Sequence, residues 1–175
     1  TFNSFQGGFD ALPNSKLLSP FVKEHLDEII DAYTRFAART PGTTSEGEIC
    51  ESILTDGFFT VPTRRILSDM HALTPHTYAY SFDWGVQAFR LARPISFHAL
   101  DVPFTFGQID RIGKGVLLAG GFDKRAYRLS RQMMDAWSAF AKTGSPNAPS
   151  SDTANPLPTW EPYSRTNRRV MLLDN

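Results

Sequence analysis

Apolar residues recur at intervals of three and four positions over residues 20–39 and 123–143, which predicts two amphipathic helices. Ser19 is expected to cap the first helix, because its hydroxyl can accept a hydrogen bond from a backbone N–H of the first turn. Gly144 should end the second, since glycine readily takes the left-handed conformation found just beyond helix ends. The expected core-facing side chains are Phe21, Val22, Leu26, Ile29, Ile30, Tyr33 and Phe36 in the first helix, and Leu129, Met133, Ala136, Trp137 and Phe140 in the second.

Another helix is expected to begin at Ser45, because Ser45 and Glu48 have the spacing of a capping box. Its apolar face continues to Phe58. Pro62 should then break or kink the run, since proline has no backbone N–H to donate. The helical pattern resumes over residues 64–70.

Two short segments have the composition of strands: residues 77–82, which are rich in aromatics, and the apolar residues 169–173. Residues 83–107 keep neither the helical nor the strand period, and irregular segments of this length often carry function in compact domains. Residues 111–122 are rich in glycine. They match neither the dinucleotide-binding nor the P-loop spacing, so they do not indicate a phosphate site.

The charges balance, with 18 Lys and Arg against 18 Asp and Glu. Such a chain offers no basic surface for nucleic acid or for an anionic membrane, so neither is expected as a partner. Cys50 is the only cysteine, which excludes a disulfide within the chain. With no signal peptide and no apolar run of bilayer length, these features favour a cytoplasmic protein. His71 and His76 miss the spacing of helical zinc ligands, and no metal site is expected.

His98 has the most distinctive context of the four histidines, because it lies in an aromatic loop that follows a predicted strand. Residues 97–107 resemble the catalytic-histidine loop of type-B carboxylesterases, the family of carboxylesterases and cholinesterases. That loop has a histidine, a small residue, an acid at the third position after the histidine, an aliphatic residue, an aromatic residue and a final Phe-Gly. The matching residues here are His98, Ala99, Asp101, Val102, Phe104, Phe106 and Gly107.

Further segments resemble the same family in the same order, and the bacterial p-nitrobenzyl esterases are the most similar branch. These segments are residues 53–62, 78–84, 137–147 and 160–163. The resemblance implies an α/β fold class. Residues 1–175 would form a single segment, the C-terminal part of an α/β-hydrolase fold, with its late sheet strands and covering helices. This segment would be incomplete without the N-terminal part.

The resemblance also implies the chemistry of a serine ester hydrolase, with no metal or organic cofactor. In that family a serine attacks the ester carbonyl, a histidine takes the serine proton, and a carboxylate orients the imidazole. His98 would be the general base. The 175 residues contain no Gly-x-Ser-x-Gly elbow and no oxyanion-hole loop. The partners expected are therefore the N-terminal portion of the same fold and a small carboxylic ester, and the chain alone should be inactive.

The triad acid of the family falls near the start of this chain, where the simplest alignment places Gln6. An amide can accept a hydrogen bond from imidazole, but it carries no charge to stabilise an imidazolium. Asp10, or an acid upstream, is the alternative. Asp101 is expected to brace the histidine loop rather than to serve as the triad acid. Four aromatic residues are candidates either for an apolar substrate pocket or for core packing: Phe58, Phe59, Trp84 and Phe97.

A different class of function remains open, namely a non-catalytic, cholinesterase-like interaction domain. The missing serine and the glutamine at the acid position suit this alternative. The retained His98 loop argues against it, because an interaction domain has no need of an imidazole at that place.

Overall fold

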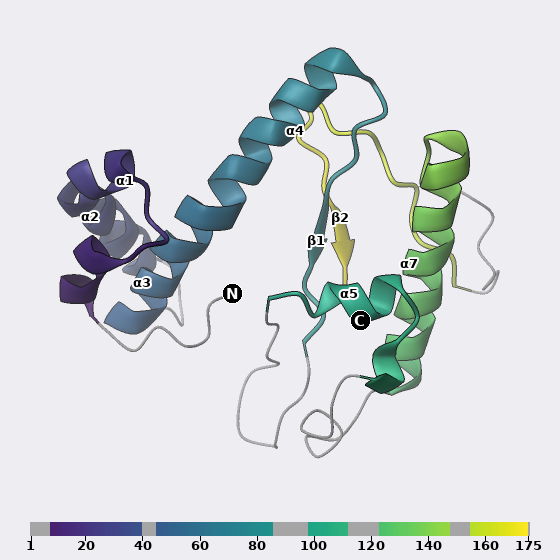
Figure 1. The fold of residues 1–175 in the computed structure, drawn as a ribbon, viewed down its shortest axis with the longest axis horizontal. Helices are drawn as coiled ribbons and strands as arrows, with labels where there is room; N and C mark the ends of the chain where they lie inside the picture. Colours follow the sequence, from purple (N-terminus) through teal and green to yellow (C-terminus); the bar gives the residue numbers. More distant parts are fainter. Residues whose placement is uncertain (1–7, 40–44, 86–97, 112–122, 148–154, 175) are drawn as a thin grey trace. The chain divides into compact units, whose positions relative to one another are not determined.

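The structure, a computed structural model, divides into two compact units, Thr1–Ile66 and Leu67–Asn175. They are called here the N-terminal unit and the C-terminal unit, and each is described by itself (Figure 1). The residues that the structure describes are 8–39, 45–85, 98–111, 123–147 and 155–174.

The N-terminal unit is built of helices around a small apolar core. Its elements are η1 (Phe9–Asn14), α1 (Pro20–Glu24), α2 (Leu26–Ala37), α3 (Glu46–Thr55), η2 (Asp56–Thr60) and the start of α4 (Val61–Leu73). The buried apolar residues are Leu12, Leu18, Leu26, Ala37, Ile49, Cys50, Ile53 and Leu54.

The helix predicted over residues 20–39 is two helices, because His25 leaves the helical conformation with φ −108° and ψ 21°. The predicted cap is confirmed, since the Ser19 hydroxyl accepts a hydrogen bond from the backbone N–H of Val22 at 3.3 Å. Two of the expected core positions are wrong: Phe21 is 65% exposed and Phe36 is 68% exposed. Phe21 lies in α1, before the break, and in the last turn of α2 the residue buried in the core is Ala37, next to Phe36.

The start of α3 confirms the predicted capping box, in which Ser45 and Glu48 each accept the other's backbone N–H. The interruption expected at Pro62 takes the form of the π-helical turn η2, which lies directly before α4. Proline has no N–H for the usual α-helical bond, and a π turn shifts the bonding pattern so that the helix can continue past the ring.

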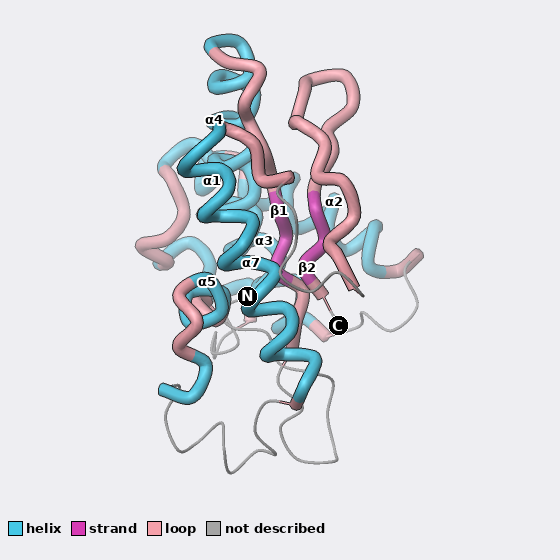
Figure 2. The backbone as a smooth tube through the Cα atoms, turned by 90° about the vertical axis from the view of Figure 1, so that its right-hand side faces the viewer, coloured by secondary structure: helices cyan, strands magenta, loops and turns pink. Residues whose placement is uncertain are grey.

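The C-terminal unit combines a pair of parallel strands with helices. Its elements after α4 are β1 (Tyr80–Phe82), α5 (Asp101–Thr105), η3 (Ile109–Arg111), α7 (Lys124–Thr143) and β2 (Met171–Leu173). Both strands lie inside the predicted segments and are shorter than predicted. In the register of the pair, Tyr80 is opposite Met171 and Phe82 is opposite Leu173 (Figure 2).

The long helix α7 contributes its apolar face to the same core as the two strands. The Asp123 side chain caps its start by accepting the backbone N–H of Arg125 at 2.9 Å, and Gly144 ends it with φ +75°, as predicted. Of its expected core face, Phe140 is 45% exposed and contacts the ring of Tyr78 edge-on. The buried core of the unit comprises Trp84, Leu100, Phe104, Ile109, Ala126, Leu129, Met133, Ala136, Trp160, Met171 and Leu173.

The segment before β2 runs back along the approach to β1. The indole N–H of Trp160 donates to the carbonyl of Ala79 at 3.0 Å, and the backbone N–H of Tyr163 donates to the carbonyl of Thr77 at 2.7 Å. The chain must then turn before it can enter β2 in the parallel direction.

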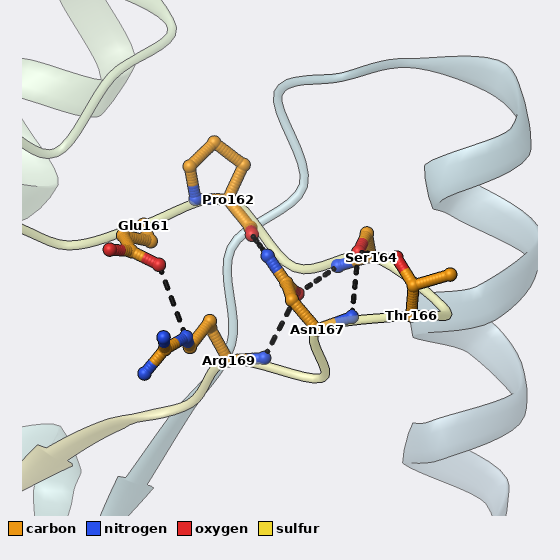
Figure 3. A network of polar contacts seen from close by, with 6 residues as sticks. All are labelled: Glu161, Pro162, Ser164, Thr166, Asn167 and Arg169. Carbon is orange, nitrogen blue, oxygen red and sulfur yellow. Dashed lines mark hydrogen bonds and ion pairs between the residues drawn. The ribbon is translucent and has the colours of Figure 1, made fainter.

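Asn167 is the centre of that turn (Figure 3). Its side-chain oxygen accepts the backbone N–H groups of Ser164, at 2.9 Å, and of Arg169, at 3.2 Å. Its side-chain N–H donates to the carbonyl of Pro162 at 3.2 Å. An ion pair of 3.2 Å between Arg169 and Glu161 closes the turn on its other side. One amide side chain therefore determines where the chain enters β2.

The Asn167 turn provides a test of this account. Asn167→Ala removes three side-chain hydrogen bonds and should lower the free energy of unfolding by about 1–2 kcal/mol, the net value of such bonds at a solvent-facing turn. Asn167→Asp keeps both acceptor bonds and should lose less than half as much. Urea unfolding of the two variants measures the difference, and equal losses would contradict the role given to the acceptor bonds.

Candidate active site

His98 opens the turn of residues 98–100 that leads into α5, and its side chain is exposed. Ala99 follows in the left-handed region, with φ +65°, and its carbonyl accepts the backbone N–H of Val102 at 3.2 Å. Leu100 is only 1% exposed and packs in the core of the C-terminal unit. The histidine therefore stands at the surface of a tight turn whose next apolar residue is anchored in the core.

The helix after the turn is fixed by one aromatic side chain. Phe104 has no exposed surface, and its ring centre lies 5.0 Å from those of Phe82 and Trp84. Its backbone carbonyl accepts a buried hydrogen bond of 2.7 Å from the Ser130 hydroxyl on α7. These contacts hold α5 to the carboxyl end of β1, the end at which open α/β sheets collect their functional loops (Figure 1).

Gly107 closes α5 with φ +63°. A Cβ at this position would lie 2.6 Å from the sulfur of Met134 on α7, well inside van der Waals contact. The left-handed backbone conformation favours glycine here, whereas the Met134 sulfur belongs to a flexible side chain that can shift.

The carboxylate of Asp101, three residues after His98, accepts a hydrogen bond of 2.8 Å from the Tyr80 hydroxyl. Burial raises the pKa of the Tyr80 phenol above its usual range, and the hydrogen bond and the charge of Asp101 add to this effect. The phenol thus keeps its proton at neutral pH and remains a donor. That Asp101 braces the histidine loop stays a prediction.

Neither candidate for the triad acid belongs to the C-terminal unit, which carries His98. Gln6 lies outside the described residues. Asp10 is exposed on η1 in the N-terminal unit, whereas His98 belongs to the C-terminal unit. The identity of the acid therefore stays a prediction.

The four aromatic pocket candidates fall into different parts of the chain. Phe58 and Phe59 lie on η2 in the N-terminal unit, with ring centres 4.7 Å apart and edge-to-face geometry. Phe97 lies outside the described residues. Trp84 is 4% exposed and packs beside Phe104, so its surface is taken up by the core.

Tyr80 was not among the residues singled out from the sequence. The signal that could have revealed it is the strand period, which places Tyr80 and Phe82 on the same face of β1. The hydroxyl of Tyr80 is the polar feature of that otherwise aromatic face.

Two general features concern membrane spans and metal clusters in the described parts of the chain. No helix there is long and apolar enough to cross a membrane. Nor does the same set of residues contain a cluster of three or more His, Cys, Asp or Glu side chains suited to a metal ion.

The chain is similar to known esterases in sequence and in structure. The model of the carboxylesterase family matches residues 11–175. The para-nitrobenzyl esterase of Bacillus subtilis (strain 168) is 29% identical over 164 residues, which cover 90% of this chain and 31% of that protein. The bile salt-activated lipase of Homo sapiens is 31% identical over 140 residues, 78% of this chain and 17% of that protein. A solved PNB esterase superposes with a TM-score of 0.68 and 26% identity, covering 99% of this chain and 31% of its own.

These similarities confirm the family and the fold class expected from the sequence. The described residues form part of an α/β-hydrolase fold. The chain spans less than a third of the length of the relatives it matches, 31% of the bacterial esterase and 17% of the human lipase.

The closure of α5 can be tested at Gly107. Gly107→Ala forces an alanine into the left-handed region and should destabilise the protein by about 1–2 kcal/mol. Gly47→Ala is the matched control, because Gly47 lies in α3 and nothing stands within 4 Å of a Cβ placed there. That control should raise stability by up to about 1 kcal/mol. Thermal unfolding distinguishes the two, and a Gly107→Ala variant as stable as the parent would contradict the strained conformation.

Proposed function

Because this chain belongs to the carboxylesterase family, we propose that it takes part in the hydrolysis of carboxylic esters, with His98 as the general base. The observation that carries the proposal is the placement of His98. Its imidazole is exposed on a turn whose next two anchors, Leu100 and Phe104, are buried. A base that must reach a nucleophile on another segment needs an exposed ring on a fixed backbone.

In the proposed reaction the serine comes from the N-terminal portion of the same fold. His98 removes the proton of the serine hydroxyl while the serine oxygen bonds to the ester carbonyl carbon. When the tetrahedral intermediate collapses, the ester C–O bond breaks and His98 returns the proton to the leaving alcohol. Water, activated by the same imidazole, then hydrolyses the acyl-enzyme and releases the acid. No step requires a metal or an organic cofactor.

The substrate class proposed is a small carboxylic ester. The relatives named para-nitrobenzyl esterase and bile salt-activated lipase support this class by their names. The 175 residues contain no Gly-x-Ser-x-Gly elbow, so residues 1–175, as a single segment without the N-terminal portion, should be inactive.

The proposal is tested with the protein that joins this chain to the N-terminal portion, assayed with p-nitrophenyl acetate. His98→Ala should lower kcat/KM by about 10⁴-fold or more, as loss of a triad histidine does in serine hydrolases. His76→Ala is the control, because His76 is an exposed histidine of the same unit. It should keep the parent rate, and a His98→Ala variant with undiminished turnover would overturn the proposal.

The same assay separates the enzyme from the alternative of a non-catalytic interaction domain. A protein that turns over no short-chain ester, and whose serine does not react with a fluorophosphonate, would favour that alternative. Covalent labelling that depends on His98 would exclude it, because an unactivated serine reacts poorly with the phosphorus centre.

The triad acid is tested by a pair of substitutions. If Gln6 occupies the acid position, Gln6→Glu adds the missing charge and should raise kcat by up to about 10⁴-fold, the size of the loss on the corresponding Asp→Asn change in trypsin. Asp10→Asn should then leave kcat unchanged. The opposite pattern, a large loss in Asp10→Asn and no gain in Gln6→Glu, would assign the role to Asp10.

A further inference from the structure

One hydrogen bond connects the sheet directly to the turn that carries His98. The Tyr80 hydroxyl on β1 donates to Oδ2 of Asp101, the first residue of α5, at 2.8 Å. Only two residues separate Asp101 from His98 along the chain. The bond therefore acts on the backbone within one turn of the imidazole.

Tyr80 is itself held in place from several sides. Its ring meets Trp137 at 5.1 Å and Trp160 at 6.2 Å between ring centres, both edge-to-face, a favourable aromatic geometry. The indole of Trp160 also donates to the carbonyl of Ala79, the residue before Tyr80. These contacts hold the Tyr80 hydroxyl at a fixed position on β1.

The carboxylate of Asp101 depends on this donor. Among the residues that the structure describes, Tyr80 is the hydrogen-bond donor found for it. Burial raises the pKa of Tyr80, with Asp101 adding to the shift, so the phenol stays protonated in the pH range in which esterases act.

The turn itself contains a strained residue. Ala99 lies in the left-handed region, which costs free energy for any residue other than glycine. One backbone hydrogen bond of 3.2 Å, from Val102 to Ala99, spans the turn. Two further anchors are the buried side chain of Leu100 and the bond from Asp101 to Tyr80. Removal of either anchor would let the turn relax toward less strained conformations.

We propose that Tyr80 is a positioning residue of the esterase site, which acts through Asp101 to hold the His98 turn in its catalytic orientation. The inference rests on the function proposed for His98. A displacement of the base by about 1 Å is enough to reduce turnover by up to about 10²-fold. A positioning residue on β1 should therefore affect kcat while it leaves substrate binding unchanged.

The test uses Tyr80→Phe in the protein that joins this chain to the N-terminal portion, again with p-nitrophenyl acetate. Loss of the hydroxyl should lower kcat by about 10-fold, with KM changed less than about twofold. Asp101→Ala removes the other partner of the hydrogen bond and should likewise lower kcat while KM changes little. The double variant should be no worse than the poorer single variant, because both substitutions break one bond.

Tyr78→Phe is the matched control. Tyr78 also contacts Trp160, at 6.4 Å between ring centres, and the same substitution removes one hydroxyl. It should leave kcat and KM at the parent values. Thermal unfolding of each variant fixes an assay temperature at which all of them are folded.

Three results would overturn the inference: a Tyr80→Phe variant with the parent kcat, an equal loss in Tyr78→Phe, or additive losses in the double variant. His98→Ala keeps this test separate from that of the proposed function. If His98→Ala is inactive and Tyr80→Phe is not impaired, the positioning role alone fails. If His98→Ala retains turnover, the proposed function fails.

Discussion

The fully buried ring of Phe104 is the contact on which the arrangement of the C-terminal unit depends. It packs against Phe82 and Trp84 on one side, while its own carbonyl is bonded to Ser130 of α7. Truncation of a side chain buried to this degree typically costs about 3–5 kcal/mol. Strand, short helix and long helix therefore meet at one residue, and the histidine turn is attached to that junction.

This arrangement separates the stability of the site from its chemistry. The residues that fix the turn are apolar and buried, whereas His98 itself is exposed and contributes little to the core. A catalytic base held by apolar contacts needs few polar groups in the interior, where each unpaired polar group would cost free energy of folding. Two hydrogen bonds are polar exceptions: the buried bond from Ser130 to the Phe104 carbonyl, and the Tyr80–Asp101 bond, which lies at the edge of the core.

Much of the local structure could be predicted from the sequence. The cap at Ser19, the box at Ser45 and the glycine at Gly144 follow from interactions within a few residues, and all three are present. The break at His25 could not be predicted, because no proline or glycine marks it and the stability of a helix depends largely on tertiary packing. The site was only partly predictable for the same reason. His98 lies in a recognisable motif, whereas the partner of Asp101 stands 21 residues away and is chosen by the fold.

The parallel pairing of β1 and β2 affects how the protein folds while it is synthesised on the ribosome. The indole of Trp160 reaches a carbonyl 81 residues earlier, and β2 follows later still. At a translation rate of about 5–20 residues per second, the edge of β1 that pairs with β2 stays unpaired for several seconds. During that interval the unpaired edge and the aromatic face of β1 are the kind of surface that promotes aggregation and that chaperones cover.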